Sequence, residues 1–350
     1  MKITVLVHAY VGHGRNAGGE TTLHDILKGC VARGASVDVV LDQKTAYTQI
    51  TDVDGVTVHP YQEWDNGKFN VLCRDTDIVL SHLDCSERAT YVAEYSHRPM
   101  VHLVHNTFWQ TEGYLAMGCD LAIYNSEWVA AHHAKANDPV AIVPETMPPP
   151  MTGVSRTATF NFKARKALGW PYVVVHPPID PTRYECTPGK HVTMVNLWEN
   201  KGPDVFYALA DRFPDVQFLG VRGGYADKHQ DIRVRDNVTI VPNSNDFRNI
   251  LMNTSILLMP SRYESFGRVA IEAGAAGIPT IASPTEGLLE ALGEGGTYAS
   301  NPVEWDAQLK KLLTPSGYTK ASKHAKARSA YWASQVEPEM DALWAALNNL

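Results

Sequence analysis

Short apolar runs alternate with helical patterns along most of this chain, and this alternation limits the possible folds more than any other feature. In the first half, the runs expected to form strands are Ile3–Val7, Val37–Leu41, Ile78–Leu80, Met100–Val104 and Leu121–Tyr124. After the first run, apolar residues recur at helical spacing, at Leu23, Ile26, Leu27, Cys30 and Val31. Apolar strands separated by helices indicate a mostly parallel sheet that is covered on both faces.

A proline-rich interval divides this alternation into two parts. Residues 138–171 contain several prolines and are predicted to form a long loop, with a short helix at Lys163–Leu168. A rigid linker is expected at His176–Pro181, because a residue that precedes proline disfavours helix. The later strands are expected at Tyr172–Val175, Val192–Val195, Val216–Leu219, Val238–Val241, Ile256–Met259 and Thr280–Ala282. We therefore expect two Rossmann-like α/β domains, residues 1–178 and 179–330, with a helix at 331–350 packing back on the first.

Composition excludes several classes of protein. The chain has 350 residues, a formal net charge of −7 and five cysteines without a CxxC pair. An acidic balance argues against a general nucleic-acid binder, and scattered cysteines favour a cytoplasmic protein without a zinc ribbon. No apolar stretch is long enough to span a membrane, although a basic run near residue 323 leaves peripheral contact with anionic lipid as an alternative. Fourteen histidines occur without a metal-binding spacing, so no metal site is predicted.

A glycine-rich segment follows the first expected strand. Gly12 to Ala17 matches the GxGxxG/A pattern of dinucleotide-binding proteins, which leaves a nicotinamide or flavin site as an alternative. In that pattern the helix begins inside the motif, whereas here helical spacing begins near Leu23, and the first later acid, Asp42, comes too late. A flexible connection without function is a second alternative. We favour a loop in which Gly18 and Gly19 let a phosphate or a sugar approach the backbone.

A strand–turn–helix segment at residues 256–279 carries the strongest functional signal. The expected strand ends at Pro260, and a helix is predicted to begin around Phe266 or Gly267. The unpaired amides at such a helix start form an anion site. Glu264 lies just outside the helix and Glu272 about two turns inside it, roughly 12 Å away at 1.5 Å per residue. This span suits a ligand with a diphosphate between two polyols, and the alternative is that both glutamates are solvated or capping residues.

A lysine lies at a second helix start. Lys201 comes directly before Gly202 and Pro203, where proline is typical of the first helical turn. A cation there opposes the helix dipole, so an anionic partner explains Lys201 better than helix stability does, with a solvated lysine as the alternative. Both helix starts follow expected parallel strands, at the edge where ligands of open α/β sheets bind.

Together these segments resemble the retaining glycosyltransferases of family 4, which have the two-domain GT-B fold with a cleft between the domains. The resemblance rests on the Gly18–Gly19 pair, the segment 196–202, the Glu264–Glu272 stretch and the segment 279–283. It implies transfer of a hexose from a nucleotide diphosphate sugar, with the donor in the second domain, the acceptor in the first, and no cofactor or metal.

The resemblance also implies roles for individual residues. Glu264 would contact the donor sugar, and Glu272 would contact the ribose diol. His105, at the end of the strand Met100–Val104, would approach the transferred sugar. The residues expected to hold the diphosphate or line the cleft are Gly18, Gly19, Lys201, Ser265, Phe266 and Gly267. Closure of the two domains about the Pro177–Pro181 linker is expected to exclude water from the donor.

One position departs from the family pattern. Members often carry an arginine five residues before the lysine, and this chain has Asn196 there. Two alternatives follow: Lys201 stands nearly alone with the helix dipole on the diphosphate, or Arg262 or Arg268 substitutes for the arginine. Two rival functions stay open, an epimerase of nucleotide sugars and a non-catalytic binding protein. Two DxD pairs, at 52–54 and 75–77, match the pattern of metal-dependent GT-A enzymes but are predicted to be solvated loop acids. The sequence does not identify the base, the sugar or the acceptor, although uracil is the favoured base.

Overall fold

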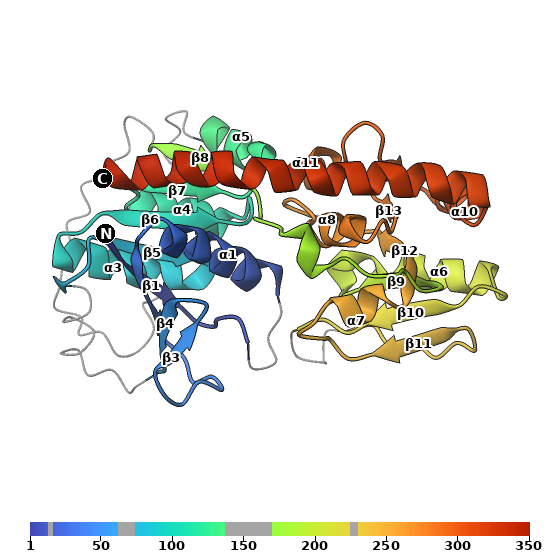
Figure 1. Ribbon diagram of the computed structural model, residues 1–350, viewed down its shortest axis with the longest axis horizontal. Helices are drawn as coiled ribbons and strands as arrows, with labels where there is room; N and C mark the ends of the chain where they lie inside the picture. Colours follow the sequence, from blue (N-terminus) through green and yellow to red (C-terminus); the bar gives the residue numbers. More distant parts are fainter. Residues whose placement is uncertain (13–16, 62–73, 137–169, 225–229) are drawn as a thin grey trace.

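Two β-sheets, each flanked by helices, form the two halves of the computed structural model (Figure 1). The structure describes residues 1–12, 17–61, 74–136, 170–224 and 230–350. The expected helix at Lys163–Leu168, most of the 138–171 loop and part of the glycine-rich segment lie outside the described residues. The two sheets confirm the predicted α/β architecture with two Rossmann-like domains.

The first sheet has the strand order β3-β4-β2-β1-β5-β6-β7-β8. Its strands are β1 (Lys2–Val7), β2 (Ser36–Leu41), β3 (Thr51–Val53), β4 (Val56–His59), β5 (Ile78–His82), β6 (Met100–Val104), β7 (Leu121–Tyr124) and β8 (Tyr172–Val174). All neighbours pair in parallel except β3 and β4, which form an antiparallel hairpin that the sequence analysis did not predict. The first DxD pair belongs to this hairpin, whose turn places Asp54 and Gly55 at positive φ.

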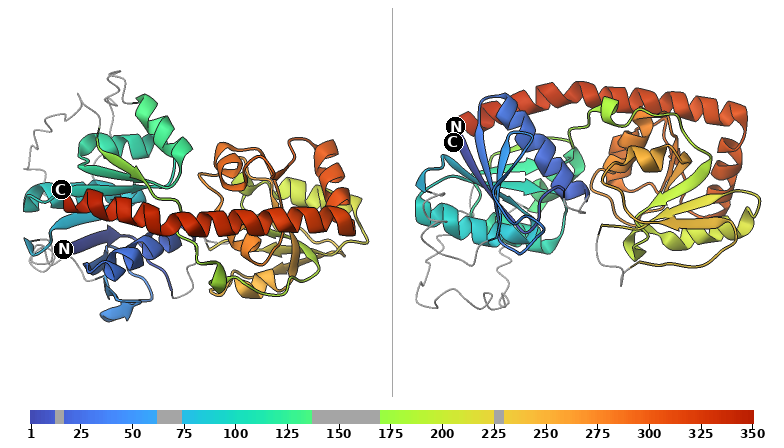
Figure 2. Two further views of the ribbon diagram at one scale, coloured as in Figure 1. Left: turned by 45° about the horizontal axis from the view of Figure 1, so that its top comes forward. Right: turned by 60° about the horizontal axis from the view of Figure 1, so that its bottom comes forward.

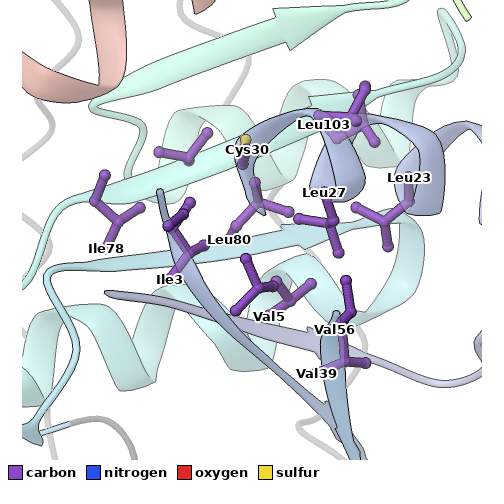
Figure 3. Packing of buried hydrophobic residues seen from close by; sticks show 14 of the residues in the cluster. Ile3, Val5, Leu23, Leu27, Cys30, Val39, Val56, Ile78, Leu80 and Leu103 are labelled. Atoms are coloured by element: carbon purple, nitrogen blue, oxygen red, sulfur yellow. The ribbon is translucent and has the colours of Figure 1, made fainter. Parts of the chain in front are cut away.

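Helices cover both faces of this sheet. They are α1 (Gly18–Ala32), α3 (Ser86–Ser96), α4 (Trp109–Met117) and α5 (Glu127–Ala136), with a short 3₁₀ turn, η1 (Leu83–Cys85). Figure 3 shows Leu23, Leu27 and Cys30 of α1 directed at the buried side chains of the sheet. The helical spacing therefore identified the packing face of α1 correctly.

The expected start of this first helix, near Leu23, was wrong. α1 begins at Gly18, so Gly18 and Gly19 form its first turn and do not belong to a loop. Glycine is costly inside a helix, but the amides of a first turn need no partner within the helix, and apolar spacing appears only where the helix packs on the sheet. The observed start still follows the last residue of the dinucleotide pattern, Ala17, so both the helix start and the late acid count against that pattern.

The second sheet is entirely parallel, in the order β11-β10-β9-β12-β13-β14. Its strands are β9 (His191–Val195), β10 (Phe218–Val221), β11 (Val238–Val241), β12 (Thr254–Met259), β13 (Thr280–Ala282) and β14 (Thr297–Tyr298). The helical segments of this half are η2 (Pro181–Arg183), η3 (Glu199–Lys201), α6 (Pro203–Arg212), α7 (Arg248–Leu251), α8 (Arg268–Ala275), α9 (Glu286–Leu292) and α10 (Pro302–Leu312). Because β9 and β12 are neighbours, the segments that follow them emerge side by side at one edge of the sheet.

One 34-residue helix, α11 (Pro315–Asn348), runs along both domains (Figure 2). Its middle packs Trp332 into the core of the second domain. Its last turns place Met340, Leu343 and Leu347 in the core of the first domain. The segment 331–350 is thus the second half of a helix that begins in the other domain. Within the described ranges, no helix is both long and apolar enough to cross a membrane.

Candidate functional site

The segments after β9 and β12 lie close together, and each contains a glycine in a left-handed conformation. Gly202 has φ +76° and caps α6, and Gly267 has φ +92° and caps α8. A Cβ atom on Gly202 would lie 2.2 Å from the carbonyl oxygen of Pro260, so only glycine permits this approach. The amide of Arg262 also donates to the carbonyl of Asn200 at 3.0 Å. Two helix amino termini, those of α6 and α8, are therefore held at one place.

Lys201 and Glu264 form an ion pair between these two segments. The Lys201 Nζ atom lies 2.5 Å from Oε1 of Glu264, and Ser261 donates its hydroxyl to the same oxygen at 2.9 Å. Both side chains retain some exposure, 29% for Lys201 and 12% for Glu264. The structure thus brings together two residues for which the family resemblance implied catalytic roles.

The start of α8 is one or two residues later than expected. The helix begins at Arg268, with Gly267 as its cap, so Ser265 and Phe266 precede it. The Phe266 side chain is buried in the core of the second domain. The amide of Ala270 donates to the carbonyl of Gly267 at 2.9 Å, and the amides before it lie at a helix start close in sequence to Glu264, the kind of place where anions bind.

Arg268 and Glu272 lie on the buried side of α8. Arg268 donates from Nε to Glu272 at 2.5 Å and from Nη2 to Asp25 of the first domain at 2.7 Å. Its Nη2 also donates to the hydroxyl of Tyr184 at 3.2 Å. Burial lowers the pKa of Arg268, but the charges of Glu272 and Asp25 outweigh it and leave the pKa above its usual range. Arg268 is therefore engaged by two carboxylates.

Arg262 and Asn196, the two remaining positions discussed for the diphosphate, differ in their surroundings. Arg262 is exposed and forms ion pairs with Glu199 at 3.3 Å and Asp204 at 3.7 Å. Asn196 has φ +69°, a left-handed conformation that asparagine tolerates better than most residues. Its side-chain oxygen accepts from the amide of Trp198 at 3.3 Å. Asn196 thus shapes the turn after β9, which gives a backbone reason for its presence.

On the first domain, His105 follows β6 and lies next to the start of α1. A Cβ atom on Gly19 would be 3.8 Å from Nε2 of His105, while one on Gly18 would meet open space. The same Nε2 lies 2.9 Å from Nδ1 of His82. Burial lowers the pKa of His105 to about 4, so its imidazole is neutral at pH 7.

Residues of the first domain also contact the segment before α8. Asn125 donates its side-chain amide to Oγ of Ser265 at 2.8 Å, and the indole of Trp128 donates to the Ser265 carbonyl at 2.7 Å. The hydroxyl of Tyr263 accepts from the amide of Thr107 at 3.0 Å. The candidate site therefore lies where the two domains meet. Sequence reasoning missed these contacts, because no local pattern signals a partner in another domain.

Three of the four acids in the DxD pairs make contacts within the first domain, and the fourth is exposed. Asp52 accepts from the amide of Gly55 inside the β3–β4 turn at 3.2 Å, and Asp54 forms an ion pair with Lys28 at 3.5 Å. Asp77 accepts from the amide of Lys2 at 2.7 Å, and Asp75 is exposed. Neither pair adjoins the segments that follow β9 and β12.

Solved structures with the same architecture define the class of fold. HepE of Anabaena, in complex with UDP-glucose, aligns over the whole of both chains with a TM-score of 0.76 and 18% identity. Sucrose-phosphate synthase of Thermosynechococcus elongatus aligns over 99% of both chains with a TM-score of 0.69 and 16% identity. The chain has the GT-B fold of glycosyltransferases.

The second domain is similar in sequence to known glycosyltransferases. Residues 192–325 match the family described as "Glycosyl transferases group 1". The D-inositol 3-phosphate glycosyltransferase of Mycobacteroides abscessus is 31% identical over 39% of this chain and 35% of its own length. That of Streptomyces coelicolor is 36% identical over 27% of this chain and 22% of its own length. The matched part thus spans about a third or less of these curated relatives. Residues 192–325 thus resemble a group 1 glycosyltransferase domain, within a chain that has the GT-B fold.

Proposed function

We propose that this protein transfers a hexose from a UDP-sugar to an acceptor hydroxyl, with retention at the anomeric carbon and without a divalent metal on the diphosphate. The observation that carries this proposal is the Lys201–Glu264 pair beside the amino terminus of α8. It offers a cation and unpaired amides for the diphosphate, and a carboxylate for sugar hydroxyls.

In this proposal, electrostatics drives the departure of the leaving group. Negative charge develops on the diphosphate as the glycosidic bond breaks, and Lys201 and the α8 amides stabilise it without reorganising. Glu264 is held by Lys201 and Ser261, so its free lone pairs accept from hydroxyls of the donor sugar. Glu272 contacts the ribose diol, from its position one turn beyond Arg268.

The acceptor approaches from the first domain, past Gly19 and His105. Because His105 is neutral at pH 7, it offers a hydrogen bond to the transferred sugar and no positive charge. No carboxylate is assigned as a nucleophile of the kind that retaining glycosidases use. The acceptor therefore attacks from the face of the leaving group, and a phosphate oxygen takes the acceptor proton.

Two similarities favour particular substrates for a first experiment. UDP-glucose is bound by HepE, which shares the fold, and this supports UDP-glucose as the first donor to test. The curated relatives are named for D-inositol 3-phosphate, which makes it the first acceptor to test alongside simple hexoses.

The test is acceptor-dependent release of UDP from UDP-glucose. We expect release with an acceptor, a rate within about twofold when Mg²⁺ or Mn²⁺ is added, and a product of retained configuration. Glu264→Gln should abolish transfer and still bind UDP, because the carboxylate serves the sugar and not the nucleotide. Consumption of donor without any acceptor would indicate the epimerase instead. Binding of UDP without turnover of any donor and acceptor would indicate a binding protein.

A further inference from the structure

Apart from the donor site, three side chains with metal-ligating atoms converge at the carboxyl edge of the first sheet. His8 follows β1, Asp42 follows β2, and Cys85 ends η1, which follows β5. β1 lies between β2 and β5, so the topology brings the three residues together. One ligand atom from each lies within 4.8 Å of the others.

Both neighbours of His8 approach the same ring nitrogen. Nδ1 of His8 lies 2.5 Å from Oδ1 of Asp42 and 3.1 Å from Sγ of Cys85. An imidazole nitrogen carries either one proton or one lone pair, so it makes one good hydrogen bond and not two. A hydrogen bond therefore accounts for one of these contacts, and the other places a further metal-ligating atom beside the same nitrogen.

A fourth residue orients one of the three ligands. Cys85 directly precedes α3 and is buried. Arg88 donates to the second carboxylate oxygen of Asp42 at 3.0 Å, which fixes the orientation of that group and leaves Oδ1 facing His8. With Arg88 counted, an ionised Asp42 and Cys85 leave a net negative charge for a divalent cation.

The geometry needs little adjustment to hold zinc. Zinc binds sulfur at about 2.3 Å and nitrogen or oxygen at about 2.0 Å, so tetrahedral neighbours lie roughly 3.3–3.6 Å apart. His8 Nδ1 would then separate from each neighbouring ligand atom by less than about 1 Å. Cysteine, histidine and aspartate together form a donor set typical of zinc and not of magnesium or calcium.

The cluster is closed on one side and open on the other. Cys85 and Asp42 are buried, while the His8 side chain is 33% exposed and faces a hollow of about 90 Å³ lined by the segments after β1 and β2. Three protein ligands with one open position are typical of reactive zinc sites, whereas closed sites have four. We propose that His8, Asp42 and Cys85 bind a zinc ion whose fourth position opens into this hollow. The site stands independently of glycosyl transfer.

Metal content tests the proposal directly. The full chain without a histidine tag is incubated with ZnCl₂, freed of unbound metal by gel filtration, and analysed for zinc by mass spectrometry. We expect about one zinc per wild-type chain, strong loss in Cys85→Ser, and no loss in Cys186→Ser. Cys186 is a partly exposed cysteine of the second domain and serves as the matched control. Equal zinc in wild type and Cys85→Ser, or none in the wild type, overturns the proposal.

Cobalt provides a second measurement that does not require a variant to fold. Co²⁺ bound to wild type through Cys85 should give a thiolate charge-transfer band in the near ultraviolet and visible bands of a tetrahedral site. Adding Zn²⁺ should displace the cobalt and remove both bands. A wild-type spectrum without the charge-transfer band overturns the proposal, even if Cys85→Ser does not fold.

Discussion

Lys201 and Arg268 are two cations with opposite surroundings, in the segments that follow β9 and β12. Lys201 is partly exposed and meets one carboxylate, that of Glu264, whereas Arg268 is buried between Glu272 and Asp25. A guanidinium suits such a fixed site because its planar donors reach several acceptors at once. An ammonium on a flexible stem keeps donors available for a ligand. Lys201 is therefore the cation that we expect to act on the diphosphate.

Replacing Lys201 tests this assignment. Lys201→Ala should lower kcat by about 10²-fold or more, because losing one donor of an oxyanion site has an effect of that size. Steady-state release of UDP measures it. Arg212→Ala is the matched control, since Arg212 lies at the far end of α6 in an exposed ion pair with Asp306, and its rate should stay within about twofold. A near-wild-type rate in Lys201→Ala would remove this residue from the mechanism.

At the residue scale, the sequence located side chains of the proposed donor site, but it did not show the contacts and backbone conformations that hold them. Lys201 and Glu264 could be predicted to be neighbours because they follow expected parallel strands. The left-handed backbone of Asn196 could not be predicted, because it depends on how the turn closes. Asp25 lies 243 positions from Arg268, so no spacing reveals their ion pair. The expectation of no metal site rested on the spacing of residues along the chain, and it stays a prediction.

At the element scale, buried parallel strands were the easiest to predict. Strands such as β6 and β7 are covered on both faces, so they are continuous apolar runs, and the predicted bounds match those observed. The hairpin β3–β4 has a half-exposed, mixed pattern and was missed. The long helix α11 combines two packing faces, one for each domain, so its apolar spacing does not show that it is a single helix.

The last turns of α11 should be essential to the first domain. Leu343 is fully buried in the core formed with β1 and α1, so Leu343→Ala should lower the free energy of unfolding by about 2–5 kcal/mol. Urea denaturation followed by circular dichroism measures the loss. Leu350→Ala serves as the control, because Leu350 is 42% exposed and its replacement should change stability by no more than about 0.5 kcal/mol. Equal stability of the two variants would show that α11 does not support this core.

At the scale of the whole molecule, His176 joins the linker to both neighbouring helices. It lies 2.7 Å from a carboxylate oxygen of Glu339 in α11 and 2.6 Å from one of Glu290 in α9. Glu290 also accepts from the first amides of α5 in the other domain. Burial lowers the pKa of His176, but the two glutamates outweigh it and raise the pKa to about 9. A protonated His176 thus holds the junction between the domains, and closure about the Pro177–Pro181 linker stays a prediction.

This raised pKa predicts the pH dependence of stability. The folded protein keeps the His176 proton up to pH 9, whereas the unfolded chain loses it near 6.5, so the stabilisation is complete below pH 6.5 and is lost as the pH rises to 9. At about 1.4 kcal/mol per pKa unit, this stabilisation amounts to roughly 3–4 kcal/mol. The difference in unfolding free energy between wild type and His176→Gln should therefore shrink over this range. A difference that stays constant with pH would contradict a protonated His176.

The central claim is that the amino terminus of α8 and Lys201 bind a diphosphate, and calorimetric titration tests it most directly. UDP, GDP and ADP are each titrated alongside the corresponding nucleoside, so the unknown base does not affect the conclusion. For the preferred base, the diphosphate should bind at least about tenfold more tightly than its nucleoside. Lys201→Ala should reduce this ratio of the two affinities. Equal affinity for the diphosphate and the nucleoside, or the same affinity ratio in Lys201→Ala as in the wild type, would contradict a diphosphate site at Lys201 and α8.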